Sequence, residues 1–152
     1  MSGLSKMKRK ITILVIEDDY NDRFFVQRIF KKVNSPAELQ FAIDGEDAIH
    51  YLAGVGKYQD RTQFPLPGLI LLDIKMPKVN GFEVLQWLKN QEGLKRLPVT
   101  VLSSSTIQSD IDRAYELGAN AYLVKPVSYE QLEKVYNRAS EFFTVEAAAP
   151  VV

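Results

Sequence analysis

The chain has 152 residues, and its 19 lysines and arginines balance its 19 aspartates and glutamates, so the formal net charge is zero. This balance argues against a dedicated nucleic-acid-binding protein, which usually carries a basic excess, and the length favours one domain with a full hydrophobic core. The absence of cysteine and the single histidine, His50, exclude disulfides, thiolate metal sites and multi-histidine metal sites.

No apolar run approaches the roughly 20 residues that a membrane-spanning helix needs. The basic residues 1–10 are not followed by the apolar core and cleavage site of a signal peptide. We therefore expect a cytoplasmic protein without a membrane partner, with a flexible, solvated basic tail at 1–10 rather than a nucleic-acid patch. A second tail is expected at 144–152.

The first apolar run, "ITILVI" at 11–16, is rich in β-branched residues and bounded by charged ones, which is typical of a buried strand. Phe25, Ile29 and Val33 then recur at every fourth position, with Phe30 beside them. This spacing predicts an amphipathic helix that ends near the "NSP" sequence that follows.

A second strand is predicted for "ELQFAI" at 38–43 and a helix for "DGEDAIHYL" at 44–52. The inward residues of this helix would be Ala48, Ile49 and Leu52. Residues 53–68 carry glycine and proline without a clear period and predict a long loop.

The third strand, "LILLDI" at 69–74, is almost wholly apolar, as expected for a strand covered on both faces. A helix is predicted at 81–90. Its apolar side would be formed by Phe82, Leu85 and Leu88. The fourth strand, "PVTVLSSS" at 98–105, ends in hydroxyl side chains.

A helix at 109–118 would be closed by Gly118, and "NAYLVKP" at 120–126 forms the fifth predicted strand. The last helix, at 128–143, would be opened by Ser128, a residue type that favours helix N-termini. Strand and helix thus alternate five times, which implies a parallel sheet with helices on both faces, joined by right-handed crossovers. Ligands in such folds gather at the carboxyl ends of the strands.

Polar side chains follow four of the five predicted strands. They are Glu17, Asp18 and Asp19 after the first, Asp73 after the third, Ser103 to Ser105 after the fourth, and Lys125 with Pro126 after the fifth. If these strands lie side by side, several carboxylates, a hydroxyl and an ammonium converge on one cleft. Oxygen ligands of this kind suit Mg²⁺ together with a phosphate, and clustered carboxylates repel one another until a cation arrives.

Such a pocket predicts phosphoryl chemistry, in which a carboxylate attacks phosphorus while Lys125 and a serine hydroxyl bind the transferred oxygens. Each residue alone has a simpler explanation. Asp19 or Asn21 can be the N-cap of the next helix, and Asp73 can be a turn residue. The occurrence of all these groups at four strand ends favours the functional interpretation.

Four segments together resemble the response-regulator receiver domain of two-component signalling. They are "ILVIEDD", "LILLDIKMPKVNGFEVL", "LPVTVLSSS" and "GANAYLVKPV", in family-like order and spacing. The resemblance covers residues 11–143 and implies one receiver domain with a flavodoxin-like (βα)5 fold. This α/β fold is a doubly wound parallel five-stranded sheet with strand order 2-1-3-4-5.

By this resemblance Asp73 is the phosphoacceptor and becomes an aspartyl phosphate. The expected Mg²⁺ contacts are Glu17, Asp18, Asp73 and the main-chain carbonyl of Lys75. The first acid, Glu17, replaces the commoner aspartate, and its contact with Mg²⁺ is expected to run through water.

Lys125 matches the lysine that pairs with phosphoryl oxygens, and its bond to Pro126 resembles the family's cis peptide. Ser103 matches the switch hydroxyl that moves towards the phosphate. Tyr122 matches the aromatic switch, whose ring turns inward when the hydroxyl moves. Ser104 stands where many members carry alanine or glycine, so the resemblance does not fix reaction rates.

The resemblance implies a response regulator that receives its phosphoryl group from a sensor histidine kinase and signals by protein–protein contact. Only about ten residues follow the last predicted helix, too few to fold, so a stand-alone receiver is expected. The loop 53–68 and the pair Phe142 and Phe143 resemble the small response regulators of bacterial phytochrome kinases. That subgroup tends to form homodimers through the face of helix four, strand five and helix five. The alternative is a phosphorelay shuttle or phosphate sink that passes the group to a histidine phosphotransfer partner.

Beyond Mg-dependent self-phosphorylation and autodephosphorylation, no enzymatic activity is expected. A haloacid-dehalogenase-type phosphatase would need a second aspartate two residues after Asp73, where Lys75 stands. A flavodoxin-like FMN carrier would need a phosphate loop rich in glycine, serine or threonine after the first strand, where three acids stand. The full set of site residues also argues against a degenerate receiver that serves only as a scaffold.

Overall fold

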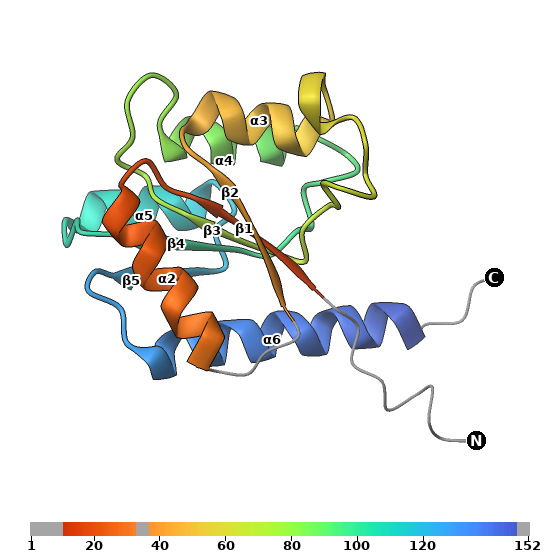
Figure 1. The fold of residues 1–152 in the computed structure, drawn as a ribbon. Coiled ribbons are helices and arrows are strands. Elements are labelled where there is room, and N and C mark those ends of the chain that lie inside the picture. The colour runs from red at the N-terminus through yellow and green to blue at the C-terminus, as the bar shows by residue number, and fades with distance from the viewer. Residues whose placement is uncertain (1–10, 33–36, 149–152) are drawn as a thin grey trace.

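The structure, a computed structural model, describes the backbone of residues 11–32 and 37–148, and the side chains of these segments as far as Glu141. Five strands in this part of the chain form one parallel sheet with the order β2-β1-β3-β4-β5 (Figure 1). Their bounds are β1 Thr12–Ile16, β2 Glu38–Ala42, β3 Leu69–Leu72, β4 Val99–Ser103 and β5 Ala121–Val124. The predicted fold and strand order are confirmed, while the tail predicted at 1–10 lies outside the described residues.

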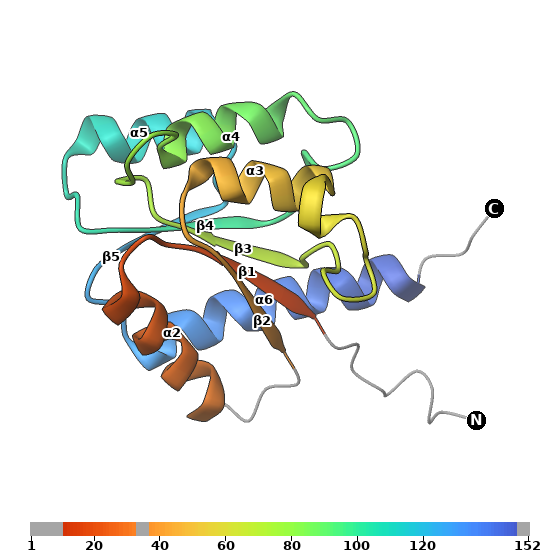
Figure 2. The same cartoon turned by 45° about the horizontal axis from the view of Figure 1, so that its top comes forward.

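Helices cover both faces of the sheet (Figures 1 and 2). On one face lie α3 (Gly45–Ala53), α4 (Gly81–Lys89) and α5 (Gln108–Glu116). On the other face lie α2 (Tyr20–Lys32) and α6 (Tyr129–Ala148). Among the described residues, no helix combines the length and the apolar character needed to cross a membrane.

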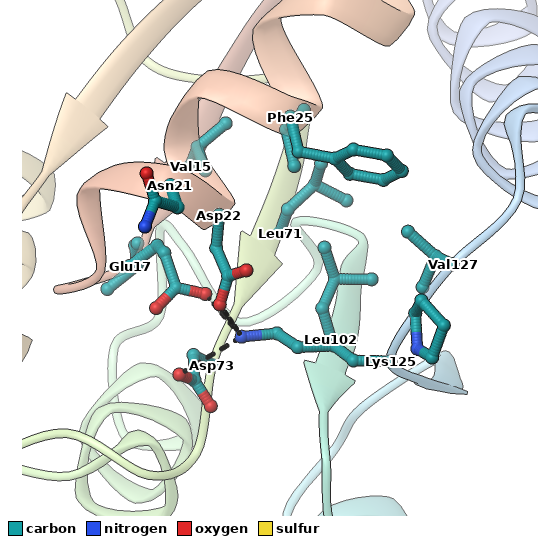
Figure 3. Close-up of a pocket in the computed structure, with 13 residues that line it drawn as sticks. Val15, Glu17, Asn21, Asp22, Phe25, Leu71, Asp73, Leu102, Lys125 and Val127 are labelled. Atoms are coloured by element: carbon teal, nitrogen blue, oxygen red, sulfur yellow. Dashed lines mark hydrogen bonds and ion pairs between the residues drawn. The ribbon is translucent and has the colours of Figure 1, made fainter.

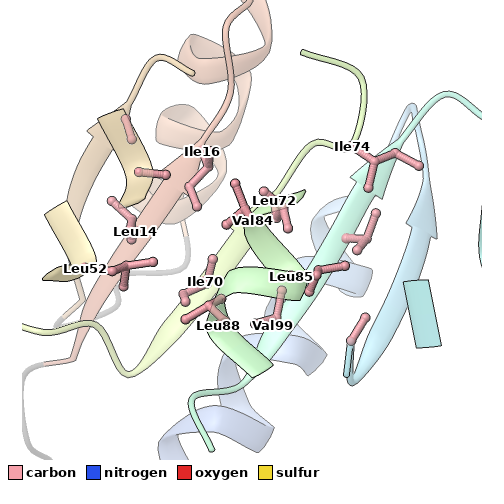
Figure 4. Close-up of a cluster of buried hydrophobic side chains, with 14 of the residues drawn as sticks. Leu14, Ile16, Leu52, Ile70, Leu72, Ile74, Val84, Leu85, Leu88 and Val99 are labelled. Carbon is pink, nitrogen blue, oxygen red and sulfur yellow. The ribbon is translucent and has the colours of Figure 1, made fainter. Parts of the chain in front are cut away.

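The central strands are buried on both faces, and successive side chains enter two separate hydrophobic cores. The core beneath α3 and α4, drawn in Figure 4, includes Leu14, Ile16, Leu52, Ile70, Leu72, Val84, Leu85 and Leu88. The core beneath α2 and α6 includes Ile13, Val15, Val26, Ile29, Phe30, Leu69, Leu71, Leu102 and Leu132. Because burial of one such side chain contributes about 2 kcal/mol, β1 and β3 are apolar at almost every position rather than at alternate ones.

The register brings the carboxyl ends of the strands to one edge of the sheet. Ile16 of β1 pairs with Leu72 of β3, and the N–H of Asp73 donates to the carbonyl of Ile16 (3.0 Å). Farther along the sheet, the N–H of Lys125 donates to the carbonyl of Ser103 (2.8 Å). The residues that directly follow these strands therefore meet at this edge.

The inward face of α2 differs from the predicted one by a single position. Phe25 is 43% exposed, whereas Val26, Ile29 and Phe30 are buried. These three residues have the i, i+3, i+4 spacing of a helical stripe, and Phe25 lies at its edge. Val33, the last residue of the predicted stripe, lies outside the described residues.

The segment 53–68, predicted as a loop, contains a short 3-10 helix, η1 (Gly56–Tyr58), and an aromatic cluster. The ring of buried Tyr58 lies 4.9 Å from the ring of Tyr51 and 5.0 Å from that of Phe64, between centroids. Tyr51 on α3 is fully buried, although it was not among the predicted inward residues. Ile49, which was among them, is only half-buried. The aromatic cluster of this insertion, residues 53–68, therefore extends the hydrophobic core beneath α3 and α4.

The ends of the last two helices agree with the predicted caps but not with the predicted length. Gly118, with φ of 106°, follows α5, and a capping box joins Ser128 and Gln131 at the start of α6 (3.1 and 2.9 Å). α6 continues past residue 143 to Ala148, and the last three residues of this extension, Glu-Ala-Ala, are strong helix formers. The side chains of Phe142 and Phe143, and residues 149–152, lie outside the described part.

Candidate functional site

Four strand ends meet at one corner of the sheet, as the sequence predicts. Glu17 follows β1, Asp73 follows β3, Ser103 ends β4 and Lys125 follows β5. Figure 3 shows the ammonium of Lys125 in the middle of this corner, facing the carboxylates of Glu17 and Asp73. The contact of Lys125 with Glu17 joins residues 108 positions apart in the sequence.

Three carboxylates form the acidic part of the site. One oxygen from each of Glu17, Asp18 and Asp73 lies within 4.8 Å of the other two. Glu17 and Asp73 are buried, whereas Asp18 is exposed to solvent. This set of oxygen donors is the one predicted for a divalent cation, and its open side leaves room for water or a phosphate oxygen as further ligands.

Lys125 is the cation that faces these carboxylates. Its Nζ lies 2.6 Å from Glu17 Oε1, 2.8 Å from Asp22 Oδ2 and 3.4 Å from Asp73 Oδ2. Burial alone would lower the pKa of Lys125, but the hydrogen bonds to Asp22 and Glu17 raise it above its ordinary value, so the side chain is charged. The Lys125–Pro126 peptide is cis, as the family resemblance implies.

Glu17 is the most perturbed carboxyl group of the site. Burial raises its pKa from 4.5 to about 7, and the charge of Asp73 adds to the rise, while the hydrogen bond from Lys125 opposes it. The N–H of Asp19 donates to Glu17 Oε2 (3.2 Å), and Arg23 Nη1 donates to the Glu17 carbonyl (2.7 Å). The buried carboxylate is thus fixed in place but only partly compensated in charge.

The entry of α2 explains the third acid of the "EDD" sequence. Asp19 is exposed, and its Oδ1 accepts from the N–H of Asp22 (3.0 Å), which makes Asp19 the N-cap of α2. Asp19 does not belong to the trio of carboxylates that lie close together. Of the two N-cap candidates in the sequence, Asp19 is the residue that fills the role.

The segment after Asp73 is held close against the start of α4. The N–H of Lys75 donates to Asp73 Oδ1 (3.0 Å), and Asn80 caps α4 in a capping box with Glu83. A Cβ added to Gly81 would lie 2.5 Å from the carbonyl oxygen of Asp73, so only glycine fits there. Asn80 and Gly81 together therefore allow α4 to begin directly against the backbone of Asp73.

The hydroxyl residues after β4 form a chain of hydrogen bonds. Ser103 is fully buried, and its Oγ accepts from the N–H of Ser105 (3.1 Å). The half-buried Tyr122 donates its hydroxyl to the carbonyl of Ser105 (2.9 Å). Ser105 Oγ in turn donates to Asp110 in the first turn of α5 (2.6 Å), so Ser103 and Tyr122 are both linked to α5 through Ser105.

Sequence reasoning gave no role to two residues of this corner, Asp22 and Ser105. Asp22 lies in the first turn of a helix, where an acid is ordinarily explained by the helix dipole, so nothing in the sequence marks it as a partner of Lys125. Ser105 is one of three consecutive serines, and only the structure separates the buried Ser103 and Ser105 from the exposed Ser104.

Comparison with known proteins agrees with this geometry. The response regulator Rcp1 of Synechocystis sp. is 36% identical over 138 residues, which cover 91% of this chain and 92% of Rcp1. The crystal structure of the phosphorylated cyanobacterial phytochrome response regulator RcpA superimposes with a TM-score of 0.75 at 34% identity, covering 93% of this chain and 98% of RcpA. The Mn²⁺-bound form of Rcp1 gives a TM-score of 0.71 at 33% identity, with coverage of 93% and 98%.

The match to a protein family covers most of the chain. Residues 13–137 match the response regulator receiver domain. This range begins at the second residue of β1 and contains the other four strands, together with Glu17, Asp18, Asp22, Asp73, Ser103 and Lys125 of the acidic corner. The fold, the strand order and the sequence match agree, and the chain belongs to the response regulator receiver family of two-component signalling.

Proposed function

We propose that this receiver domain accepts a phosphoryl group on Asp73 from the phosphohistidine of a sensor histidine kinase. The observation that carries the proposal is the position of Asp73. It is a buried carboxylate at the sheet edge, within 4.8 Å of two further carboxylates and 3.4 Å from Lys125 Nζ. Such an arrangement suits a nucleophile that must carry added negative charge.

In the proposed transfer, an oxygen of Asp73 attacks the phosphorus atom and the phosphorus–nitrogen bond of the donor breaks. The imidazole leaves with the electron pair of that bond, and an aspartyl phosphate remains. The Lys75 N–H holds Oδ1 of Asp73, which leaves Oδ2, on the side of Lys125, to attack. Lys125 and the hydroxyl of Ser103 would bind the transferred oxygens and stabilise their charge.

The three carboxylates of Glu17, Asp18 and Asp73, which we call the acidic trio, fit Mg²⁺ as the cofactor. Its donors are all oxygen atoms, and Glu17, Asp18 and the main-chain carbonyl of Lys75 would complete the protein's contacts beside Asp73. When bound, Mg²⁺ supplies positive charge that offsets the repulsion between the carboxylates and the incoming phosphoryl group. Burial and, to a smaller extent, the charge of Asp73 keep the pKa of Glu17 raised although Lys125 donates a hydrogen bond to it.

The output of the proposed reaction would be a change of surface near α5 and β5. A phosphoryl group on Asp73 would draw the hydroxyl of Ser103 away from the N–H of Ser105. Tyr122, bonded to the Ser105 carbonyl, would then change its ring position. The face formed by α5, β5 and α6 would carry the signal by protein–protein contact.

The proposed partners follow from the relatives. Because Rcp1 and RcpA are response regulators and RcpA belongs to a cyanobacterial phytochrome, we take a phytochrome-type histidine kinase as the partner to test first. A homodimer through the α5–β5–α6 face is supported by its exposed apolar side chains. These are Ile107 (58% exposed), Tyr115 (47%) and Val124 (37%).

Intact-protein mass spectrometry after incubation with Mg²⁺ and acetyl phosphate tests the reaction. The wild-type chain should gain one alkali-labile phosphoryl group, and Asp73→Asn should gain none. An unmodified wild type, or the same adduct on Asp73→Asn, would contradict the proposal.

Metal binding can be tested separately. Asp18→Ala should weaken Mg²⁺ binding, because Asp18 belongs to the acidic trio. Asp19→Ala serves as the matched control, since Asp19 is a neighbouring acid that only caps α2. Equal losses in both variants, measured by calorimetry, would remove Asp18 from the metal site.

Size-exclusion chromatography with and without beryllofluoride tests the dimer. A shift to twice the mass, abolished by a charged residue at Tyr115 or Ile107, is expected. A chain that stays monomeric under both conditions would exclude the proposed homodimer.

A further inference from the structure

Lys125 forms a salt bridge with Asp22, a carboxylate outside the acidic trio. Lys125 Nζ lies 2.8 Å from Asp22 Oδ2, closer than its distance of 3.4 Å from Asp73. Asp22 is not among the three carboxylates whose oxygens lie within 4.8 Å of one another. Asp22 therefore contacts Lys125 and is not one of the expected metal ligands.

The fold of α2 places Asp22 against Lys125. Asp19 caps the helix through the N–H of Asp22, and Arg23, the next residue, is fixed by its bond to the Glu17 carbonyl (2.7 Å). With its backbone held on both sides, Asp22 directs its carboxylate at the ammonium, as Figure 3 shows. Its side chain is 43% exposed, against 20% for Lys125 and 5% for Glu17.

A cavity beside the site leaves the lysine room to move. Its volume is about 410 Å³, and Asp22, Asp73 and Lys125 all line it. The cavity is also lined by apolar side chains, among them Phe25, Leu71 and Leu102 (Figure 3). Because the ammonium already lies 3.4 Å from Asp73 Oδ2 and borders this cavity, a turn of the lysine side chain alone would bring it to a group on Asp73.

We propose that Asp22 is a positioning residue that competes with the phosphoryl group for Lys125 and thereby lowers the affinity of the site for phosphoryl-like anions. This inference rests on the proposed function of Asp73. A phosphoryl group needs the single ammonium of the corner, and every contact that Lys125 keeps with Asp22 is one it cannot give to the phosphoryl oxygens. The charge of Asp22 also repels the incoming anion.

A purely structural ion pair would behave differently. A partly exposed pair contributes little to stability, and its loss would change the unfolding midpoint slightly while leaving anion binding as it was. The competition instead predicts a gain in anion affinity when the carboxylate is removed. Anion affinity at fixed, saturating Mg²⁺ is therefore the measurement that separates the two explanations.

The experiment is a calorimetric titration of the whole chain with beryllofluoride, a phosphoryl analogue, at saturating Mg²⁺. Asp22→Asn keeps the size of the side chain and removes its charge. Asp19→Asn is the matched control, because it makes the same charge change one helical turn away and still caps α2. Asp22→Glu restores a carboxylate at the same position, and thermal unfolding checks that each variant is folded.

The expected result is that Asp22→Asn binds beryllofluoride about fivefold more tightly than wild type, while Asp19→Asn and Asp22→Glu stay within about twofold. The inference is overturned if Asp22→Asn binds as wild type or more weakly, if Asp19→Asn gains as much, or if Asp22→Glu matches Asp22→Asn. A wild-type chain that binds no beryllofluoride with Mg²⁺ would instead overturn the proposed function of Asp73.

Discussion

The aromatic insertion and the acidic corner both hold charged side chains that are buried or half-buried, but the charges are paired differently in the two regions. In the aromatic insertion at 53–68, Arg61 donates to three carbonyl oxygens, those of Tyr51 (2.8 Å), Leu52 (2.9 Å) and Phe64 (3.1 Å). The hydroxyl of Tyr58 donates to Asp47 (2.6 Å) in the same region. Arg61 and the Tyr58 hydroxyl therefore each have acceptors of their own.

The acidic corner lacks such matching. Glu17, Asp22 and Asp73 share the one ammonium of Lys125, and the pKa of buried Glu17 rises to about 7 as a result of burial and of its neighbour Asp73. A structural polar cluster pairs its charges within the protein, whereas a ligand-binding cluster leaves part of its charge unpaired. The polar groups of the insertion have their partners in the structure, whereas the carboxylates of the corner outnumber the positive charge of Lys125, which is the charge balance expected of a site for a cation.

The largest effect is expected from Arg61→Ala, which would break the matched region. Three carbonyl oxygens would lose a charged donor, and we expect a loss of about 3 kcal/mol in the free energy of unfolding, measured in urea. The gain in stability on adding Mg²⁺ should stay as in wild type. Lys57→Ala is the control, because exposed Lys57 only lies over the ring of Tyr58 (5.1 Å). A loss no greater than that of the control would refute the account of the insertion.

Asp73→Asn should act in the opposite direction on the unmatched region. Asparagine keeps the acceptor for the Lys75 N–H but removes one of the crowded charges. We expect the metal-free variant to be more stable than wild type by about 1.5 kcal/mol, because the repulsion on Glu17 is relieved. Its further gain with Mg²⁺ should largely disappear. A metal-free variant less stable than wild type would show that the corner is balanced without its cation.

These two regions also differ in how much of them the sequence predicts. The sequence predicts that Glu17, Asp18, Asp73 and Lys125 meet, because they directly follow strands and the carboxyl ends of parallel strands lie at one edge of the sheet. Asp22 was missed, because it reaches Lys125 from a helix whose rotation about its own axis is set by packing.

The sequence predicts a loop at 53–68 but not the packing of the aromatic insertion. Its residues have no period, and its aromatic cluster depends on Tyr51, which lies on α3 two positions after Ile49, a predicted inward residue that is only half-buried. The one-position difference on α2, where Val26 rather than Phe25 is buried, has the same origin. Helical spacing leaves two neighbouring stripes nearly equivalent, and only tertiary contacts decide between them.

The pH dependence of Mg²⁺ binding should report the unmatched charge directly. The folded chain binds the proton of Glu17 more tightly than the unfolded chain, so this group makes the metal-free protein less stable as pH rises from about 4.5 through 7. Mg²⁺ must displace that proton, so its affinity should rise about tenfold between about pH 6 and pH 8.

Glu17→Gln is the variant that tests the source of this dependence. It should bind Mg²⁺ more weakly and with a nearly flat profile over the same range, measured by calorimetry in buffers of equal ionic strength. A wild-type affinity that does not change with pH would mean that Glu17 is ionised throughout, and the corner would then be better compensated than its burial indicates.

The smallest effect on stability is expected from Ser105→Ala, at a residue that lies next to the acidic corner but outside it. Ser105 Oγ accepts from the N–H of Ile107 (3.3 Å) and donates to Asp110 (2.6 Å), so this hydroxyl is matched like those of the insertion although it lies beside Ser103. Its loss should cost about 1 kcal/mol of stability, as for a lost helix cap, without changing Mg²⁺ affinity. Ser109→Ala, at an exposed position of α5, is the control. If Ser105→Ala also alters Mg²⁺ affinity, the Ser105 hydroxyl is coupled to the carboxylates of the acidic corner even without a phosphoryl group. The functional site would then extend to the start of α5.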